Sequence, residues 1–189
     1  FADIDGDLDQ DILITGNISS GPISKLYVND GIGNFSLKAN TPFIGVNSGS
    51  LAFADIDGDG DQDVLITGGT NSARSSELYT NDGTGNFSID DNAPFQPVYE
   101  SSIAFADLDG DLDQDVLITG DSNFGFISEL YANDGNGNFS LVGNITFTGV
   151  ENGAIAFADI DGDIDKDDLI TTVSHSGVTY NLYRNITSN

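Results

Sequence analysis

The chain contains no cysteine, no methionine and no tryptophan, and its 189 residues include a single histidine. Without cysteine there is neither a disulfide framework nor a thiolate metal site, so sulfur says nothing about the redox compartment. A zinc site would need histidine or cysteine ligands, which His175 alone cannot supply. Any metal chemistry in this sequence must therefore depend on oxygen ligands.

Basic side chains are also few, and they are scattered rather than clustered. They are Lys25, Lys38, Arg74, Lys166 and Arg184. Nucleic-acid binding needs clustered positive charge to neutralise phosphates, and the net charge here is −26, so we expect no DNA or RNA partner. The apolar runs are far shorter than the roughly 20 residues that cross a bilayer, so we expect a soluble chain without membrane insertion.

The residue in excess is aspartate, and it is gathered in four copies of one motif. DIDGDLDQD begins at Asp3 and returns as DIDGDGDQD at Asp55, DLDGDLDQD at Asp107 and DIDGDIDKD at Asp159, each 52 residues after the last. Such an unvarying period marks a repeat protein. The repeats are 1–52, 53–104, 105–156 and the shorter 157–189, and we treat residues 1–189 as a single repeat domain.

Each complete repeat is predicted to hold four short strands. In the second repeat they are 51–55, 64–68, 77–81 and 86–90, and the last two flank the turn sequence NDGTGNF, whose Asn, Asp and Gly favour a tight hairpin. No window shows helical periodicity. Four-stranded repeats of about 50 residues predict an all-β fold of antiparallel blades, a β-propeller, with all twelve Phe and six Tyr packed between blades.

The acidic motif predicts a calcium loop. Carboxylates stand at alternate positions 1, 3, 5, 7 and 9 around a glycine at position 4, and calcium accepts six to eight oxygen ligands in irregular geometry. Like charges this close are unfavourable without a cation. An EF-hand is excluded because Ile66 stands at position 12, where a bidentate Glu is needed, and an RTX repeat is excluded because the period is not nine. The candidate ligands are Asp3, Asp5, Asp7, Asp9, Asp11, Asp55, Asp57, Asp59, Asp61, Asp63, Asp107, Asp109, Asp111, Asp113, Asp115, Asp159, Asp161, Asp163, Asp165 and Asp167.

The run FADIDGDGDQDVLITG, followed by ELYTNDGTGNF, resembles the FG-GAP and VCBS repeats of integrin-α-type calcium-binding propellers, and the resemblance extends over the whole chain. It implies that each loop joins the first two strands of a blade. It further implies that positions 1, 3, 5 and 9 bind calcium through side chains and that position 7 binds through its main-chain oxygen, with its carboxylate facing solvent. About four Ca²⁺ ions are expected, although Lys166, Asp168 and the sequence RNITSN depart from the pattern in the fourth repeat.

These features predict a non-catalytic, calcium-stabilised scaffold or adhesion module that is secreted or displayed at the cell surface, with a protein or glycan partner. Weak calcium sites fill outside the cytosol, which favours secretion, and we find no catalytic constellation. The alternative is a carbohydrate-binding propeller or the non-catalytic propeller of a secreted polysaccharide-active enzyme. It would need an exposed loop aromatic, and only Phe124 and Phe126 cluster on a loop, where we expect core packing.

Two further expectations concern assembly and modification. Since 52-residue repeats leave the fourth repeat incomplete, we expect the missing strand to come from residues outside the chain or from a second copy, which would give a ring or a head-to-tail filament. Six glycosylation sequons are present, three of them in the repeated GNFS turn, where turn chemistry explains them equally well. They begin at Asn17, Asn34, Asn86, Asn138, Asn144 and Asn185.

Overall fold

A computed structural model describes residues 1–143, 147–158, 167–174 and 177–183, with side chains through residue 158. The described residues contain strands and no helix, in agreement with the predicted all-β class. The strands are β1 (Ile12–Ile18), β2 (Gly21–Asn29), β3 (Phe35–Leu37), β4 (Leu51–Ala54), β5 (Asp63–Gly69), β6 (Arg74–Asn81), β7 (Phe87–Ile89), β8 (Val98–Ala106), β9 (Asp115–Ser122), β10 (Gly125–Asn133), β11 (Phe139–Leu141), β12 (Ala154–Ala158), β13 (Asp167–Ser174) and β14 (Gly177–Tyr183).

Each repeat forms one antiparallel meander. In the second repeat β4 pairs with β5, β5 with β6 and β6 with β7, and the third repeat has the same order in β8 to β11. The first repeat pairs β1, β2 and β3, with a bridge between Ala2 and Asp11 where its first strand lies, and the fourth pairs β12, β13 and β14. The four strands predicted for the second repeat are therefore confirmed to within one residue at their ends, except that β6 begins three residues earlier than predicted.

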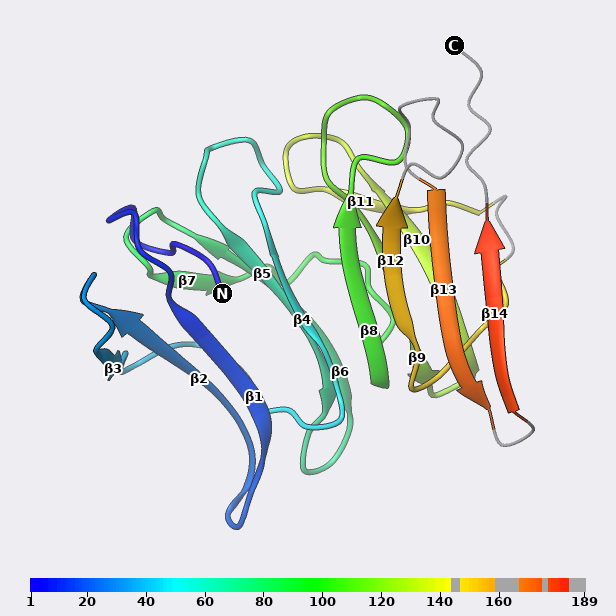
Figure 1. Cartoon of the computed structure of the whole chain (residues 1–189), viewed down its shortest axis with the longest axis horizontal. Helices are drawn as coiled ribbons and strands as arrows, with labels where there is room; N and C mark the ends of the chain where they lie inside the picture. Colours follow the sequence, from blue (N-terminus) through cyan, green and yellow to red (C-terminus); the bar gives the residue numbers. More distant parts are fainter. Residues whose placement is uncertain (144–146, 159–166, 175–176, 184–189) are drawn as a thin grey trace.

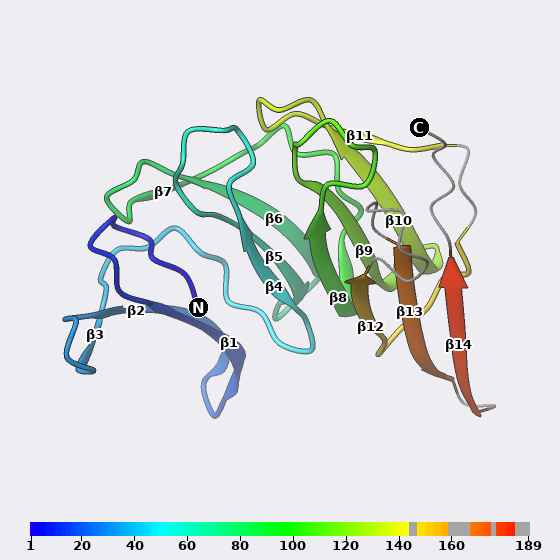
Figure 2. The same ribbon diagram turned by 45° about the horizontal axis from the view of Figure 1, so that its top comes forward.

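The sheets follow one another in an arc (Figures 1 and 2). Their first strands lie on the inner side, where β8 contacts both β4 and β12. A single residue pair, Ser75 with Val98, links the sheets of the second and third repeats. The described residues form no closed ring of sheets, so ring closure and blade count stay predictions.

Aromatic packing joins consecutive repeats in the same way at two junctions. The segment after β3 places Phe43 edge-on against Tyr79, with ring centroids 5.0 Å apart. The segment after β7 places Phe95 against Tyr131 at 4.9 Å. Buried aliphatic residues surround both pairs, so the two larger core clusters lie between the sheets of consecutive repeats. The buried residues of a third, smaller cluster all come from the third repeat.

The prediction that every aromatic ring is buried is wrong for four phenylalanines. Phe1 is 76% exposed, Phe35 44%, Phe124 89% and Phe126 54%. Phe35 occupies the repeat position of the buried Phe87 and Phe139, but no described ring packs on it as Phe43 and Phe95 pack on those two. Phe124 lies in the turn between β9 and β10, and Phe126 is the second residue of β10.

Candidate metal centre

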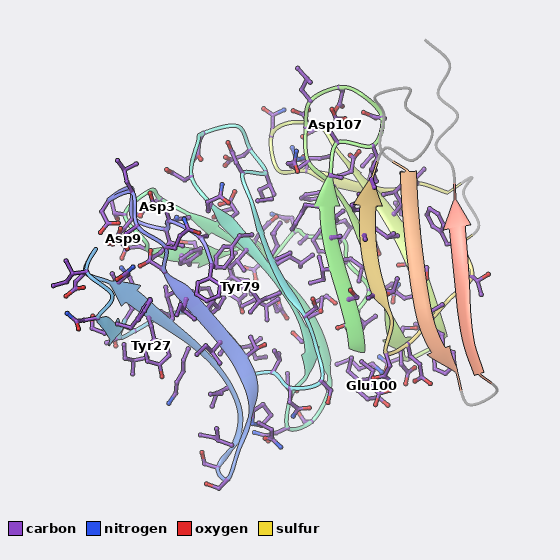
Figure 3. The ribbon with its side chains drawn as sticks, viewed as in Figure 1. Asp3, Asp9, Tyr27, Tyr79, Glu100 and Asp107 are labelled. Carbon is purple, nitrogen blue, oxygen red and sulfur yellow. The ribbon has the colours of Figure 1, made fainter. Side chains whose placement is uncertain are left out.

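The acidic loops join the first strand of each repeat to the second. In the second repeat the loop leaves β4 at Ala54 and enters β5 at Asp63, and these two residues pair across the ladder. The equivalent pairs are Ala2 with Asp11 and Ala106 with Asp115. The labelled Asp3, Asp9 and Asp107 lie at the same end of the sheets, the upper end in Figure 3.

The aspartate at loop position 1 shapes the turn through backbone amides. Oδ1 of Asp55 accepts the N–H of Gly58 at 2.8 Å, and Oδ2 accepts the N–H of Gly60 at 3.1 Å. Asp3 and Asp107 accept the matching amides of their own loops. Gly58 has φ +76, a conformation that L side chains rarely adopt, which explains the glycine at position 4.

The aspartate at loop position 9 is buried and ties the loop to the third strand. Oδ2 of Asp63 accepts the N–H of Ile56 at 3.1 Å, and Oδ1 accepts the N–H of Asn81 at 2.8 Å. Asp11 and Asp115 make the same two bonds. Burial raises the pKa of Asp63 to about 6, although the two amides act in the opposite direction.

The structure brings three aspartates of each described loop together, at positions 1, 3 and 9. One carboxylate oxygen of each lies within 4.8 Å of the others. Ligands at about 2.4 Å from one calcium ion can be at most about 4.8 Å apart, so one ion could contact all three. The triads are Asp3, Asp5 and Asp11; Asp55, Asp57 and Asp63; and Asp107, Asp109 and Asp115.

The aspartates at position 5 lie outside these triads. Asp7, Asp59 and Asp111 are exposed. Each accepts the N–H of the aspartate two residues later, at 3.1, 2.9 and 3.0 Å respectively. Their predicted role as side-chain ligands therefore stays a prediction.

The aspartates at position 7 do not face solvent as the resemblance implied. Asp9, Asp61 and Asp113 are half-buried. A side chain on Gly83 would collide with the Asp61 carboxylate, and one on Gly135 would collide with Asp113. Burial, followed by repulsion from neighbouring aspartates, raises the pKa of Asp61 and of Asp113. The glycine of the NDG turn thus leaves room for the acidic loop of the same repeat.

Two carboxylate oxygens in the first loop fit a cation site. Oδ1 of Asp5 and Oδ1 of Asp9 are buried and have no hydrogen-bond partner. Burial is the largest cause of the raised pKa of each group, and repulsion from Asp7 comes next. Buried polar atoms almost always have partners, so the donor set fits a bound hard cation.

Sequence reasoning missed the asparagine that opens each NDGxGNF turn. It was assigned to turn chemistry, but Asn81 and Asn133 are buried and reach the acidic loop of the preceding repeat. Nδ2 of Asn81 donates to the carbonyl of Ile4 at 2.9 Å, and Nδ2 of Asn133 donates to that of Ile56 at 2.7 Å. Only its fixed spacing of 52 residues could have suggested this role.

Several predicted residues lie outside the described part of the chain. The fourth loop is affected most, since Asp159, Asp161, Asp163 and Asp165 are not described and Asp167 is placed only as backbone at the start of β13. His175, Asn144 and Asn185 also fall there. The fourth calcium site therefore stays a prediction.

Comparison with family models identifies the repeats. The model of the FG-GAP-like repeat matches three times, at residues 3–66, 55–118 and 107–171, and each match runs from one acidic loop into the next. These matches take in most of the chain, which therefore belongs to the FG-GAP-like repeat family. Searches of curated proteins and of solved structures found no match. No helix in the described residues is long and apolar enough to cross a membrane.

Proposed function

We propose that this protein is a calcium-stabilised, propeller-type scaffold or adhesion module that works outside the cell. The observation that carries the proposal is the threefold recurrence of a carboxylate triad, each with oxygens within 4.8 Å. Two of these loops also accept a hydrogen bond from the following repeat. The family membership is consistent with it.

Calcium suits these loops better than other common cations. All candidate ligands are oxygen atoms, which excludes zinc as the preferred ion. Magnesium demands near-octahedral geometry at about 2.0–2.1 Å, whereas calcium tolerates the irregular, crowded donor set of an aspartate loop. The residues at positions 1, 3 and 9 would hold the ion. Burial, followed by repulsion from neighbouring aspartates, raises the pKa of Asp57 and of Asp109, and the charge of the ion would offset both effects.

Work outside the cell follows from the calcium requirement. Weak calcium sites, with Kd on the order of 0.1–1 mM, fill at extracellular calcium concentrations and not in the cytosol. The hairpins opposite the acidic loops differ among the repeats and would present the contact surface, since variable loops on a regular scaffold commonly carry binding. Self-association, ring closure and the lack of catalysis stay predictions.

Thermal unfolding with and without calcium tests the proposal. Each filled site adds roughly 0.4–1.4 kcal/mol at millimolar calcium, because the ion binds only the folded loop. We expect the melting temperature to be several degrees higher in 1 mM calcium than in EDTA, and magnesium at the same concentration to raise it less. Equal melting temperatures in calcium and in EDTA would contradict the proposal.

A carbohydrate-binding role is the second candidate. It needs an exposed aromatic side chain on a loop, and the structure exposes Phe124 by 89% and Phe126 by 54%, against our expectation of core packing. A glycan array probed with the wild-type protein and with Phe124→Ala tests this role. Binding that the substitution removes would favour it over a purely protein-binding scaffold.

A further inference from the structure

A groove lies between the β5–β6 hairpin of the second repeat and the β9–β10 hairpin of the third. Its volume is about 610 Å³. It lies at the opposite end of the sheets from the acidic loops, where these hairpins turn at the lower edge of Figure 1. Its polar lining comes from Asn47, Thr70, Ser72, Arg74, Tyr99 and Asn123.

Arg74, one of the residues that line this groove, makes three hydrogen bonds to the third repeat. Its Nε donates to the carbonyl of Asp121 at 2.9 Å, its Nη2 to Oδ2 of Asp121 at 3.0 Å and its Nη1 to Oδ1 of Asn123 at 2.9 Å. The guanidinium lies over the ring of Tyr99, 4.7 Å from the ring centroid. Arg74 thus positions residues of both repeats, while the remaining N–H groups of the guanidinium stay available as donors.

The repeats themselves show that the fold does not require this cluster. The junction between the first and second repeats has Pro22, Asn47 and Gly69 at the positions of Arg74, Tyr99 and Asp121. That junction still packs Phe43 on Tyr79 in the geometry of Phe95 on Tyr131. The arginine, the tyrosine and the aspartate are therefore particular to one junction in an otherwise periodic molecule.

An exposed aromatic side chain stands on the same turn as one of the groove residues, although it is not itself part of the groove lining. Phe124 follows Asn123 in the same tight hairpin and is 89% exposed. Its N–H donates to Oγ of Ser122 at 3.1 Å, so the backbone there is fixed. The equivalent residues in the first two repeats are Ser20 and Ser72, which shows that the hairpin position does not need a phenylalanine.

We infer that this groove binds a neutral saccharide. Its amide, hydroxyl and guanidinium groups match the alternating donors and acceptors of sugar hydroxyls, and the face of an aromatic ring suits the C–H face of a pyranose. The positive charge of Arg74 is already paired with the carboxylate of Asp121. The net charge of −26 further disfavours an anionic ligand. The inference gives a site to the second candidate function and does not depend on calcium binding.

A panel of soluble neutral oligosaccharides of the gluco-, manno-, xylo- and N-acetylglucosamine series tests the inference by isothermal titration in calcium. We expect one series to bind, and Phe124→Ser and Asn123→Ala each to weaken that binding by about tenfold or more, equivalent to about 1.4 kcal/mol. Phe124→Ser copies the residue of the first two repeats and should fold normally. Ile32→Thr is the matched control, since it removes an 84% exposed apolar side chain from a turn outside the groove.

Three outcomes would overturn the inference. The first is that no neutral oligosaccharide series binds. The second is that Phe124→Ser and Asn123→Ala both keep wild-type binding. The third is that only acidic oligosaccharides, or only members of a peptide library tested in parallel, bind. The calcium-dependent melting temperature is measured on the same samples. Failure of saccharide binding with that temperature shift intact would reject the groove and leave the calcium proposal standing.

Discussion

The aspartates of one loop perform different tasks although the sequence spaces them evenly. Position 1 holds the turn amides, position 9 ties the loop to the third strand, and position 3 completes the triad. Position 5 is exposed and position 7 lies against the glycine of the neighbouring turn. The five carboxylates should therefore differ in their effect on calcium binding.

Asp63→Asn and Asp59→Asn test this difference in the second loop. Asp63 belongs to the triad and Asp59 does not, so we expect Asp63→Asn to remove about 1 kcal/mol of calcium stabilisation and Asp59→Asn to remove less. The measurement is the difference in unfolding free energy between calcium and EDTA for each variant. An equal loss from both substitutions would show that position 5 ligates as strongly as the triad.

Asp82, in the NDG turn, should titrate at unusually low pH. Hydrogen bonds from the Thr84 and Asn86 side chains lower its pKa to about 2 from the model-peptide value of 3.8. Because the folded-state pKa is the lower one, its stabilising contribution is present above pH 3.8 and is lost as the pH falls through about 2.

The carboxyl-carbon chemical shift of Asp82, followed by NMR against pH, measures this pKa. Thr84→Ala removes the strongest donor, whose hydroxyl lies 2.6 Å from Oδ1 of Asp82, and should raise the midpoint. A wild-type midpoint near 4 would contradict the expectation.

The NDGxGNF turn makes hydrogen bonds within itself and to the preceding repeat, and the sequence pattern indicates only the first of these. Within the turn, Asn34, Asn86 and Asn138 donate from their side chains to Asp30, Asp82 and Asp134. This confirms the turn chemistry that we gave as one explanation of these sequons, while glycosylation stays a prediction. Between repeats, the turn's first asparagine donates to the preceding acidic loop.

Alanine substitution of that first asparagine should distinguish its role between repeats from its role within the repeat. Asn133→Ala leaves the carbonyl of Ile56 without its 2.7 Å partner, and we expect a loss of about 1–3 kcal/mol. Asn29→Ala is the control, since Nδ2 of Asn29 donates to Gln10 of its own repeat and to no other described repeat. Chemical denaturation in EDTA measures both variants. A loss from Asn29→Ala as large as that from Asn133→Ala would argue against the link between repeats.

The molecule as a whole is stabilised by contacts between repeats. The two larger core clusters each draw their residues from two consecutive repeats, and Phe43 and Phe95 cross from one repeat to the next. In addition, the loop of one repeat contacts the turn of the following repeat through Ile4 and Gly85. Calcium binding in one loop should therefore stabilise its neighbour too.

Phe95→Ala tests how far the arc depends on one junction. Phe95 is 6% exposed and contacts Tyr131 and Phe139, so we expect a loss of about 3–5 kcal/mol. Phe35→Ala, at a ring that is 44% exposed, should cost much less. Unfolding monitored by circular dichroism and by tyrosine fluorescence measures both. Similar losses from the two substitutions would contradict an aromatic core between repeats.

The sequence alone determined the repeat period, the all-β class, the strand positions and the acidic loops. Each of these depends on local patterning, namely alternation along a strand, turn residues and residue spacing, which a single chain displays directly. The sequence predicted the triad at positions 1, 3 and 9 only as part of a set of five equivalent aspartates, because alternate spacing does not reveal which carboxylate oxygens converge.

Only the tertiary structure decided the rest, because those features depend on which repeat faces which. In the structure the carboxylates of Asp9, Asp61 and Asp113 lie against glycines, and Asn81 and Asn133 are buried against a preceding loop. Two hairpins of different repeats form a groove that includes Asn123, and the next residue, Phe124, is exposed. Each of these involves residues far apart along the chain. Stacking of sheets brings them together, and that stacking is set by the packing of side chains across the junctions.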